Sequence, residues 1–250
     1  MVSLFRPRSS KPIPVVEPDA TAFPKIQGAD LAAAFAGQRI AGDFYDSLRV
    51  SPERVLFGLL DVAGRRDEIG DLLSAAQQTF RSSGAKLFAA PDINESDVMT
   101  ELSLDINRAL IEASKGVASC PAFIACYHEK FGTLCYANGG HTPGLLRDPS
   151  GITELASTGL PLGLFSHATA EAPTVAMEED SVLLLVSRGV VECGAGTEEF
   201  GLDRIKTFLQ NSKAQSAQEL CSSLLGSAGA FCQGAPMRDD RTCLALMRTA

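Results

Sequence analysis

The 250-residue sequence has few of the features that mark common classes of metal or nucleotide site. It contains only three histidines, and its seven cysteines form no CxxC pair. These absences argue against a His-rich metal cluster, a zinc site and a disulfide framework, and they predict reduced, mostly buried thiols. Neither a GxxxxGKS/T nor a GxGxxG loop is present, so no known nucleotide-binding phosphate loop is indicated.

Excess positive charge is also missing, because 22 Lys and Arg stand against 30 Asp and Glu, for a net charge of −8. A general binder of nucleic acid or anionic membrane needs net positive charge, so neither partner is expected. No apolar run approaches 18 residues, and no apolar signal-peptide region stands near the N-terminus. The sequence therefore predicts a cytoplasmic protein. Its oligomeric state stays open, with a dimer as one option.

The composition predicts one folded domain preceded by a short tail. Hydrophobic residues make up 45% and charged residues 21%, which is typical of a globular chain. Residues 1–24 carry five prolines and little periodicity, so they are interpreted as a tail or linker. Residues 25–250 form the predicted domain.

Three segments have helical periodicity. Apolar residues recur from Ile69 to Phe80, with Gly84 as a stop signal, and from Val98 to Ala113 after Asp97 as N-cap. Ser216 and Glu219 form a capping box before a third apolar stripe. Six short apolar segments predict strands: 55–60, 123–127, 133–136, 144–146, 182–186 and 243–247. Because the helices cluster in blocks, the pattern favours an α+β fold with antiparallel sheets.

Acidic residues stand at the ends of several predicted strands. The segment GDFYD at 42–46 holds two of them, DVAG at 61–64 ends an apolar strand, and DDRT at 239–242 precedes the last strand. Mg²⁺ and Mn²⁺ prefer oxygen ligands, so carboxylates that converge from several strand ends could hold such an ion. Taken one at a time, each motif is more often an ordinary strand-end or turn acid than a metal ligand.

The order of these motifs resembles the PPM-type, protein-phosphatase-2C-like domains of the RsbU and sporulation-stage-II-E class. The similarity runs from about residue 25 to residue 248, and single motifs of this length would be weak signals. Seven segments carry it in order: GDFYD at 42–46, DVAG at 61–64, ANGGHTPGLL at 137–146, TGLPLGLF at 158–165, LLLVSRGVVEC at 183–193, EEFGLDRI at 198–205 and DDRTCLAL at 239–246.

The resemblance implies a central antiparallel β-sandwich with helices on both outer faces. It also implies two Mg²⁺ or Mn²⁺ ions that activate a bridging hydroxide for attack on phosphoserine or phosphothreonine. By position, Asp43, Asp61 and Asp239 correspond to the carboxylate ligands, with the Val62 carbonyl assisting. The class acts on phosphorylated regulatory proteins such as anti-sigma-factor antagonists, which are the partners that the resemblance implies.

The sequence departs from this pattern at one ligand. Ser187-Arg188-Gly189 stands where the class has Thr-Asp-Gly, so the site charge becomes −2 in place of −4. A guanidinium cannot serve as a metal ligand, so the two-metal centre is predicted to be degraded, with one ion or none. Three interpretations of Arg188 stay open: it replaces an ion and binds phosphate, it abolishes catalysis, or it points away and pairs with Glu192 or another acid.

A second departure follows Asp61, where Arg65 and Arg66 replace the usual glycine and histidine segment. Arg65 is a candidate phosphate-binding residue, and a solvated helix start is the equally weighted alternative. His141 is interpreted as a turn histidine in preference to a general acid. Together these features predict a metal-dependent protein phosphatase with a degraded site. The alternative is an inactive pseudophosphatase that binds a regulatory protein.

Overall fold

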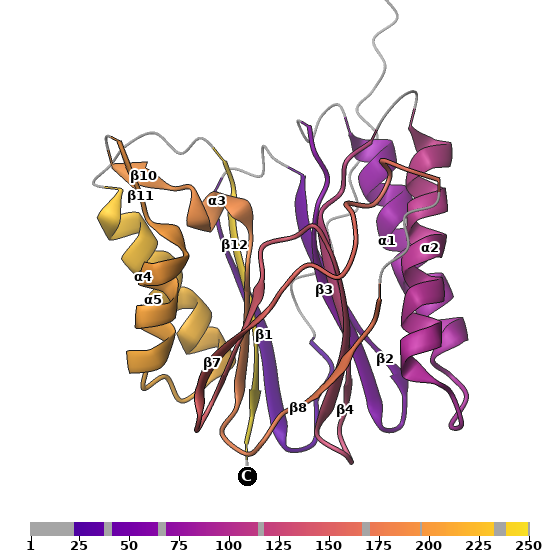
Figure 1. Cartoon of the computed structure of the whole chain (residues 1–250), viewed down its shortest axis with the longest axis horizontal. Helices are drawn as coiled ribbons and strands as arrows, with labels where there is room; N and C mark the ends of the chain where they lie inside the picture. The colour runs from indigo at the N-terminus through magenta and orange to yellow at the C-terminus, as the bar shows by residue number, and fades with distance from the viewer. Residues whose placement is uncertain are drawn as a thin grey trace, which may run out of the picture.

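Two five-stranded antiparallel sheets face each other, and helices cover both outer faces (Figure 1). The computed structural model describes residues 23–37, 42–64, 69–114, 118–166, 171–195, 197–232 and 239–249. The β1 sheet has the order β1 (Ala29–Ala36), β12 (Arg241–Arg248), β9 (Val182–Val186), β6 (Gly144–Asp148) and β7 (Gly151–Leu155). The β2 sheet has the order β2 (Asp43–Ser51), β3 (Arg54–Asp61), β4 (Ala122–His128), β5 (Thr133–Gly139) and β8 (Thr174–Ala176).

The helices belong to two separate layers. In Figure 1, α1 (Gly70–Leu87) and α2 (Glu95–Ala113) cover the β2 sheet on the right, while α4 (Gly201–Asn211) and α5 (Ala217–Phe231) cover the β1 sheet on the left. The short helix α3 (Arg188–Val191) lies at the upper end of the β1 sheet, near the small ribbon of β10 (Gly194–Ala195) and β11 (Glu198–Glu199). This α+β sandwich confirms the predicted fold class.

The core has three layers, one between the two sheets and one between each sheet and its helices. They arise because successive side chains along a strand point to opposite faces of the sheet. In β3, Val55 and Phe57 face the other sheet, whereas Leu56 and Leu60 face α1 and α2. All four side chains are fully buried. A strand buried on both faces is apolar throughout, which is why β3 was recognisable as a run without polar alternation.

All six predicted strands are present, but two details of the predicted helices are wrong. Gly84 does not end α1, because the helix continues to Leu87 and uses the glycine for packing. A Cβ at Gly84 would lie 2.5 Å from Cδ2 of Leu56. The N-cap of α2 is Asn94, whose side chain accepts from the backbone of Ser96 and Asp97, so Asp97 belongs to the first turn.

The capping box before α5 is confirmed. Ser216 Oγ accepts from the backbone N–H of Glu219 at 3.1 Å, and the Glu219 carboxylate accepts from the backbone N–H of Gln215 at 2.8 Å. Asp30 in β1 adds a further acceptor, because it receives the backbone N–H of Ala217 at 2.7 Å. These bonds satisfy donors at the start of the helix that have no intrahelical partner.

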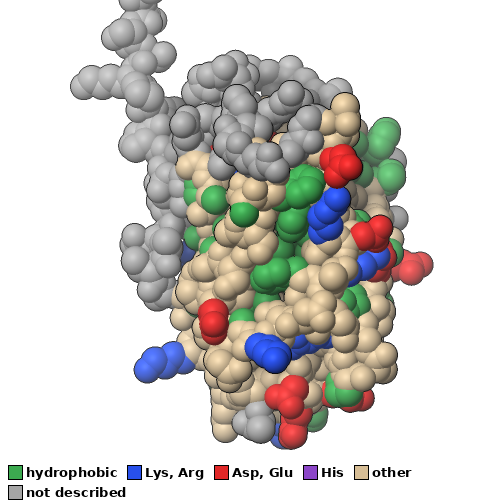
Figure 2. All heavy atoms as spheres, turned by 90° about the vertical axis from the view of Figure 1, so that its left-hand side faces the viewer, with side chains coloured by type: hydrophobic (Ala, Val, Ile, Leu, Met, Phe, Trp, Pro, Cys, Tyr) green, Lys and Arg blue, Asp and Glu red, His purple; other side chains and the backbone are tan. Residues whose placement is uncertain are grey.

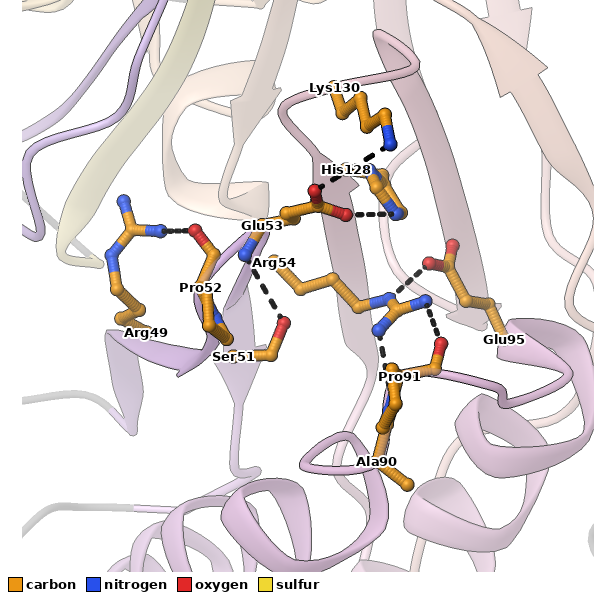
Figure 3. Close-up of polar contacts among 10 residues, drawn as sticks. All are labelled: Arg49, Ser51, Pro52, Glu53, Arg54, Ala90, Pro91, Glu95, His128 and Lys130. Atoms are coloured by element: carbon orange, nitrogen blue, oxygen red, sulfur yellow. Dashed lines mark hydrogen bonds and ion pairs between the residues drawn. The ribbon is translucent and has the colours of Figure 1, made fainter.

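A buried arginine ties the connection between α1 and α2 to the β2 sheet (Figure 3). Arg54 is only 7% exposed, and its Nε donates to Oε1 of Glu95 at 2.6 Å. Its two terminal nitrogens donate to the carbonyls of Ala90 at 3.3 Å and Pro91 at 3.0 Å. These three acceptors lie in the α1–α2 connection or at the first residue of α2, so Arg54 fixes the start of α2 against β3.

The outer surface of the β1 layer contains an apolar groove. Figure 2 shows hydrophobic side chains in a band over this face, and the groove between α4 and α5 has a volume of about 370 Å³. Arg204 lies over the ring of Phe231 at 4.6 Å and partly covers one wall. Among the described residues, no helix is long and apolar enough to cross a bilayer.

Candidate metal and phosphate site

Asp43 and Asp61 stand opposite each other in register, at the start of β2 and the end of β3. Both side chains are nearly buried, at 4% and 8% exposure. Alternation along β2 places Asp43 on the face between the two sheets, while Phe44 faces the helices. The sequence prediction that these two acids converge is therefore consistent with the register of the sheet.

The second acid of the GDFYD segment has a different role. Asp46 faces α1, where Arg81 makes a bidentate ion pair with two contacts of 2.6 Å, and Gln77 donates at 3.3 Å. Three residues along a strand reverse the side-chain direction, so Asp46 cannot reach the space between the sheets. It fastens α1 to β2 and lies outside the acidic pair.

Hydrogen bonds from the opposite sheet hold Asp43. Thr242 in β12 donates its hydroxyl to Oδ2 of Asp43 at 2.9 Å. The backbone N–H of Thr242 donates to Oγ of Ser187 at 3.0 Å, and the N–H of Ser187 donates to the Thr242 carbonyl at 2.9 Å. The end of β9, the start of β12 and the acidic pair are thus one connected unit. Sequence reasoning did not single out Ser187 or Thr242 as part of it.

Burial and mutual repulsion favour the protonated forms of the paired acids. Burial, followed by the charge of Asp61, raises the pKa of Asp43 to about 7. Burial also raises the pKa of Asp61, and the positive charge of Arg188 offsets part of that effect. Two buried carboxyls with raised pKa values in one space mark this end of the sandwich as a candidate functional site.

Asp239 and Asp240 point in different directions before β12. Asp239 is partly exposed, and its Oδ1 accepts the backbone N–H of Asp240 at 2.9 Å. Asp240 is 1% exposed and lies against the end of β1, where a Cβ at Gly37 would come within 2.2 Å of its carboxylate. The sequence assigned the metal-ligand role to the first acid, and that assignment stays a prediction. The arrangement supports it, because Asp239 is the one of the two beside Arg188.

Arg188 lies beside Asp239 and Glu192. Its Nη2 lies 3.5 Å from Oδ2 of Asp239, and its Nε lies 3.9 Å from Oε1 of Glu192 one helical turn later. The side chain is 56% exposed, so it keeps donors available to solvent. The third sequence interpretation included an ion pair with Glu192, and that pair is present. The same guanidinium also pairs with Asp239, so Arg188 does not point away from the predicted metal ligands.

The donor set fits a divalent cation by its chemistry, since it offers hard carboxylate oxygens in a partly dry space. Within the described residues, however, no three His, Cys, Asp or Glu side chains lie close enough together to form a ligand group. The carbonyl oxygen of Val62 lies close to Gly42. A Cβ built on Gly42 would be only 1.8 Å from that oxygen. Arg65 and Arg66 fall outside the described residues.

His141 lies in the irregular connection between β5 and β6, and not in an assigned turn. Its backbone N–H donates to Oδ1 of the buried Asn138 at 2.9 Å, and Nδ1 contacts Thr142. Burial lowers the pKa of His141 to about 4, so the ring is neutral near pH 7. A neutral, buried ring of this kind cannot protonate a leaving group in that pH range.

We expect Gly189→Ala to destabilise the protein by about 1–3 kcal/mol. A Cβ at Gly189 would lie 2.0 Å from the Asp240 carbonyl oxygen, so α3 and the segment before β12 must separate. Gly226→Ala in α5 is the matched control, because that Cβ meets nothing within 4 Å and should stabilise the helix by up to about 1 kcal/mol. Urea unfolding measures both, and equal midpoints for the two variants would contradict the predicted steric contact.

Comparisons with known proteins agree with this geometry. The family profile described as Stage II sporulation protein E (SpoIIE) matches residues 51–249. The phosphoserine phosphatase RsbP of Bacillus subtilis (strain 168) is 23% identical over 190 residues, which cover 76% of this chain and 45% of RsbP. The chain therefore spans less than half the length of that curated relative.

Solved structures show the same fold. The RsbU and RsbW domains of Rv1364c from Mycobacterium tuberculosis superpose with a TM-score of 0.73 at 21% identity, covering 89% of this chain and 60% of that one. The SiaA-PP2C domain of Pseudomonas aeruginosa gives a TM-score of 0.72 at 16% identity, covering 88% and 86%. With a PP2C-type sandwich and a family match over most of its length, the chain belongs to the SpoIIE family of PPM-type phosphatase domains.

Proposed function

We propose that this domain is a metal-dependent phosphoserine/phosphothreonine protein phosphatase of the bacterial partner-switching type, in which Arg188 replaces one ligand aspartate. The observation that carries the proposal is the register pair of Asp43 and Asp61, two buried carboxylates between the sheets with raised pKa values. Thr242 and Ser187 donate hydroxyl hydrogen bonds to Asp43, and such neutral donors suit a site that receives a metal cation.

The residues that would hold Mg²⁺ or Mn²⁺ are Asp43, Asp61, Asp239 and the carbonyl of Val62. When bound, such an ion activates water and neutralises charge on the phosphoryl oxygens. The chain itself supplies the orientation, because Thr242 and Ser187 hold the Asp43 side chain from the opposite sheet. Arg188, with solvent-accessible donors beside Asp239, is the residue placed to bind a phosphate oxygen.

One observation favours a second candidate function, a pseudophosphatase that binds a regulatory protein without hydrolysis. The Arg188–Asp239 ion pair engages a carboxylate that metal binding would need. Losing the aspartate at position 188 also leaves a site charge of −2, enough to balance one divalent ion. In this candidate function the same face recognises its partner, but the second ion never binds.

The proposed partner is a phosphorylated regulatory protein of the anti-sigma-antagonist type. RsbP carries the name of a phosphoserine phosphatase, and Rv1364c joins an RsbU domain to an RsbW domain in one chain. We place the activity in the cytoplasm, since the seven cysteines are all free thiols, as in reducing compartments. Arg65 remains a second candidate for phosphate binding.

A phosphoserine peptide and an aryl phosphate, each with Mn²⁺ and without it, test the proposal. We expect slow hydrolysis that requires Mn²⁺ and is lost in Asp61→Asn. Asp203→Asn is the matched control, because it removes the same charge from a side chain that is fully exposed on α4. Hydrolysis that survives in Asp61→Asn would overturn the assigned site. Binding of the peptide without any hydrolysis would establish the pseudophosphatase alternative.

A further inference from the structure

Three residues outside the acidic pair form a second reactive cluster, which we call the thiol–arginine cluster: Cys193, Cys232 and Arg241. Arg241 begins β12 and, by alternation, points away from Asp43 toward the helices that cover the β1 sheet. Cys193 follows α3, and Cys232 is the C-cap of α5. Figure 1 shows the C-terminal end of α5 at the same end of the molecule as α3.

Arg241 is a buried cation whose contacts are unusual. It is 6% exposed, and its Nη2 donates to Sγ of Cys232 at 3.3 Å. In the part of the chain that the structure describes, its Nε has no hydrogen-bond partner and no carboxylate forms an ion pair with it. A desolvated guanidinium is unfavourable without a counter-charge. A sulfur atom that becomes negative at Cys232 would supply that charge.

The two cysteines meet at one carbonyl group. Sγ of Cys193 donates to the Val190 carbonyl at 3.2 Å and lies 3.9 Å from the Ala228 carbonyl oxygen, which also accepts the backbone N–H of Cys232 at 3.2 Å. Burial, followed by the contact with Cys232, raises the pKa of Cys193 to about 12, so this thiol stays protonated. The thiol that touches the arginine is Cys232. The charge of Arg241 also acts on Cys193 and offsets part of the rise in its pKa, but the guanidinium donates its hydrogen bond to Cys232.

Two other thiol pairs in the chain provide an internal comparison. Cys126 and Cys135 are opposite each other in β4 and β5, and Cys221 of α5 lies in the same buried cluster as Cys243 of β12. All four are completely buried, whereas Cys193 and Cys232 are 9% and 4% exposed. Among the described residues, the arginine–sulfur hydrogen bond occurs at Cys232. The charge of Arg54 also acts on Cys126, so a nearby cation is not specific to one pair. Among the described residues, the direct arginine–sulfur hydrogen bond is what sets the Cys193/Cys232 pair apart.

We propose that Cys193 and Cys232 are an oxidisable dithiol that hydrogen peroxide converts into a disulfide, with Arg241 stabilising negative charge on the Cys232 sulfur. The Cys232 sulfur attacks one peroxide oxygen, the O–O bond breaks, and a sulfenic acid and one water form. The Cys193 sulfur then displaces the hydroxyl group, the S–S bond forms, and the second water leaves with the thiol proton. Two thiols lose two electrons, and one peroxide becomes two waters.

The bond would constrain both segments that lead to the acidic site. Cys193 lies five residues after Arg188, and Cys232 lies seven residues before Asp239. A disulfide here would join the end of the α3 segment to the end of α5. Neither cysteine lies in a strand, so the bond would form without breaking a hydrogen bond of either sheet.

The test is to treat the full chain with hydrogen peroxide, alkylate the remaining thiols and identify the cross-linked peptides by mass spectrometry. We expect a Cys193–Cys232 disulfide while the Cys126/Cys135 and Cys221/Cys243 pairs stay alkylated. In Cys193→Ser, the sulfenic acid of Cys232 should persist and be trapped by dimedone. No disulfide at this pair, or equal oxidation of all three pairs, would overturn the proposal.

Arg241 is tested separately. Arg241→Gln should slow disulfide formation about fivefold or more, while Arg241→Lys, which keeps the charge, should stay within about twofold of the wild type. Circular dichroism checks that each variant is folded. If Arg241→Gln does not fold, Arg241→Met, which removes the charge and keeps an unbranched stem, replaces it, and the rate of dimedone trapping in Cys193→Ser with and without Arg241→Met decides. A trapping rate that is unaffected by removing the charge would refute the role of Arg241.

Discussion

Arg188→Asp is expected to raise Mn²⁺-dependent hydrolysis of an aryl phosphate by about tenfold or more. The substitution removes the cation that lies 3.5 Å from Asp239 and supplies a carboxylate at the first residue of α3. The backbone there is already held, because Ser187 exchanges hydrogen bonds with Thr242. The site charge changes from −2 to −4, which balances two divalent ions.

Two control variants separate the effect of the new ligand from that of the lost cation. Arg188→Asn removes the positive charge without adding a carboxylate, and Glu192→Gln breaks the second ion pair of Arg188. Neither should bind a second Mn²⁺ by calorimetry, whereas Arg188→Asp should. If Arg188→Asp binds no second ion, this one substitution did not disable the site. If the wild type is faster than Arg188→Asp, Arg188 is a working phosphate-binding residue.

Without metal, the free energy of unfolding should fall as the pH rises from about 4 to about 7, and Asp43→Asn should flatten this dependence. The folded-state pKa of Asp43 is raised from 3.8 to about 7, so in this window the folded protein binds a proton that the unfolded chain has released. Stability is therefore greatest below the unfolded pKa and declines toward the folded one. A shift of this size corresponds to at most about 4 kcal/mol.

Urea unfolding in EDTA at pH 5 and at pH 8 measures this effect. Asp43→Asn should be more stable than the wild type at pH 8, because an amide still accepts the Thr242 hydroxyl and carries no buried charge. Mn²⁺ should restore wild-type stability at pH 8 and leave Asp43→Asn unchanged. Asp203→Asn is the control and should follow the wild-type profile. Parallel profiles for Asp43→Asn and the wild type would show that Asp43 ionises normally.

The sequence predicted the strands that are buried on both faces and missed those that are not. Five of the eight residues of β1 are alanine, which has a weak strand preference, so this strand did not stand out. β2 carries two buried acids, and these polar residues hid a core strand whose acids have side-chain partners on α1 and β12. β1 pairs with β12 at the other end of the described chain, whereas β2 forms a hairpin with the next strand, β3.

The candidate site likewise has features that were predictable from the sequence and features that were not. Its acids were recognisable as strand-end motifs in a fixed order, because ligand type and chain position are properties of the sequence. The direction of each side chain was not, since it depends on which sheet face the chain presents. Asp43 faces the space between the sheets, and Asp46, three residues later, faces α1.

By itself, the sequence determined the α+β sandwich class, the ends of the apolar strands, the capping box of α5 and the presence of an arginine in place of a ligand acid. Only the tertiary structure decided where Arg188 and Arg241 direct their charges. Arg188 of α3 forms an ion pair with Asp239, 51 positions later in the sequence. Arg241 of β12 donates a hydrogen bond to Cys232 at the C-terminal end of α5. Such pairings arise when sheets and helices pack together, because local periodicity specifies only which face of its own element a residue occupies.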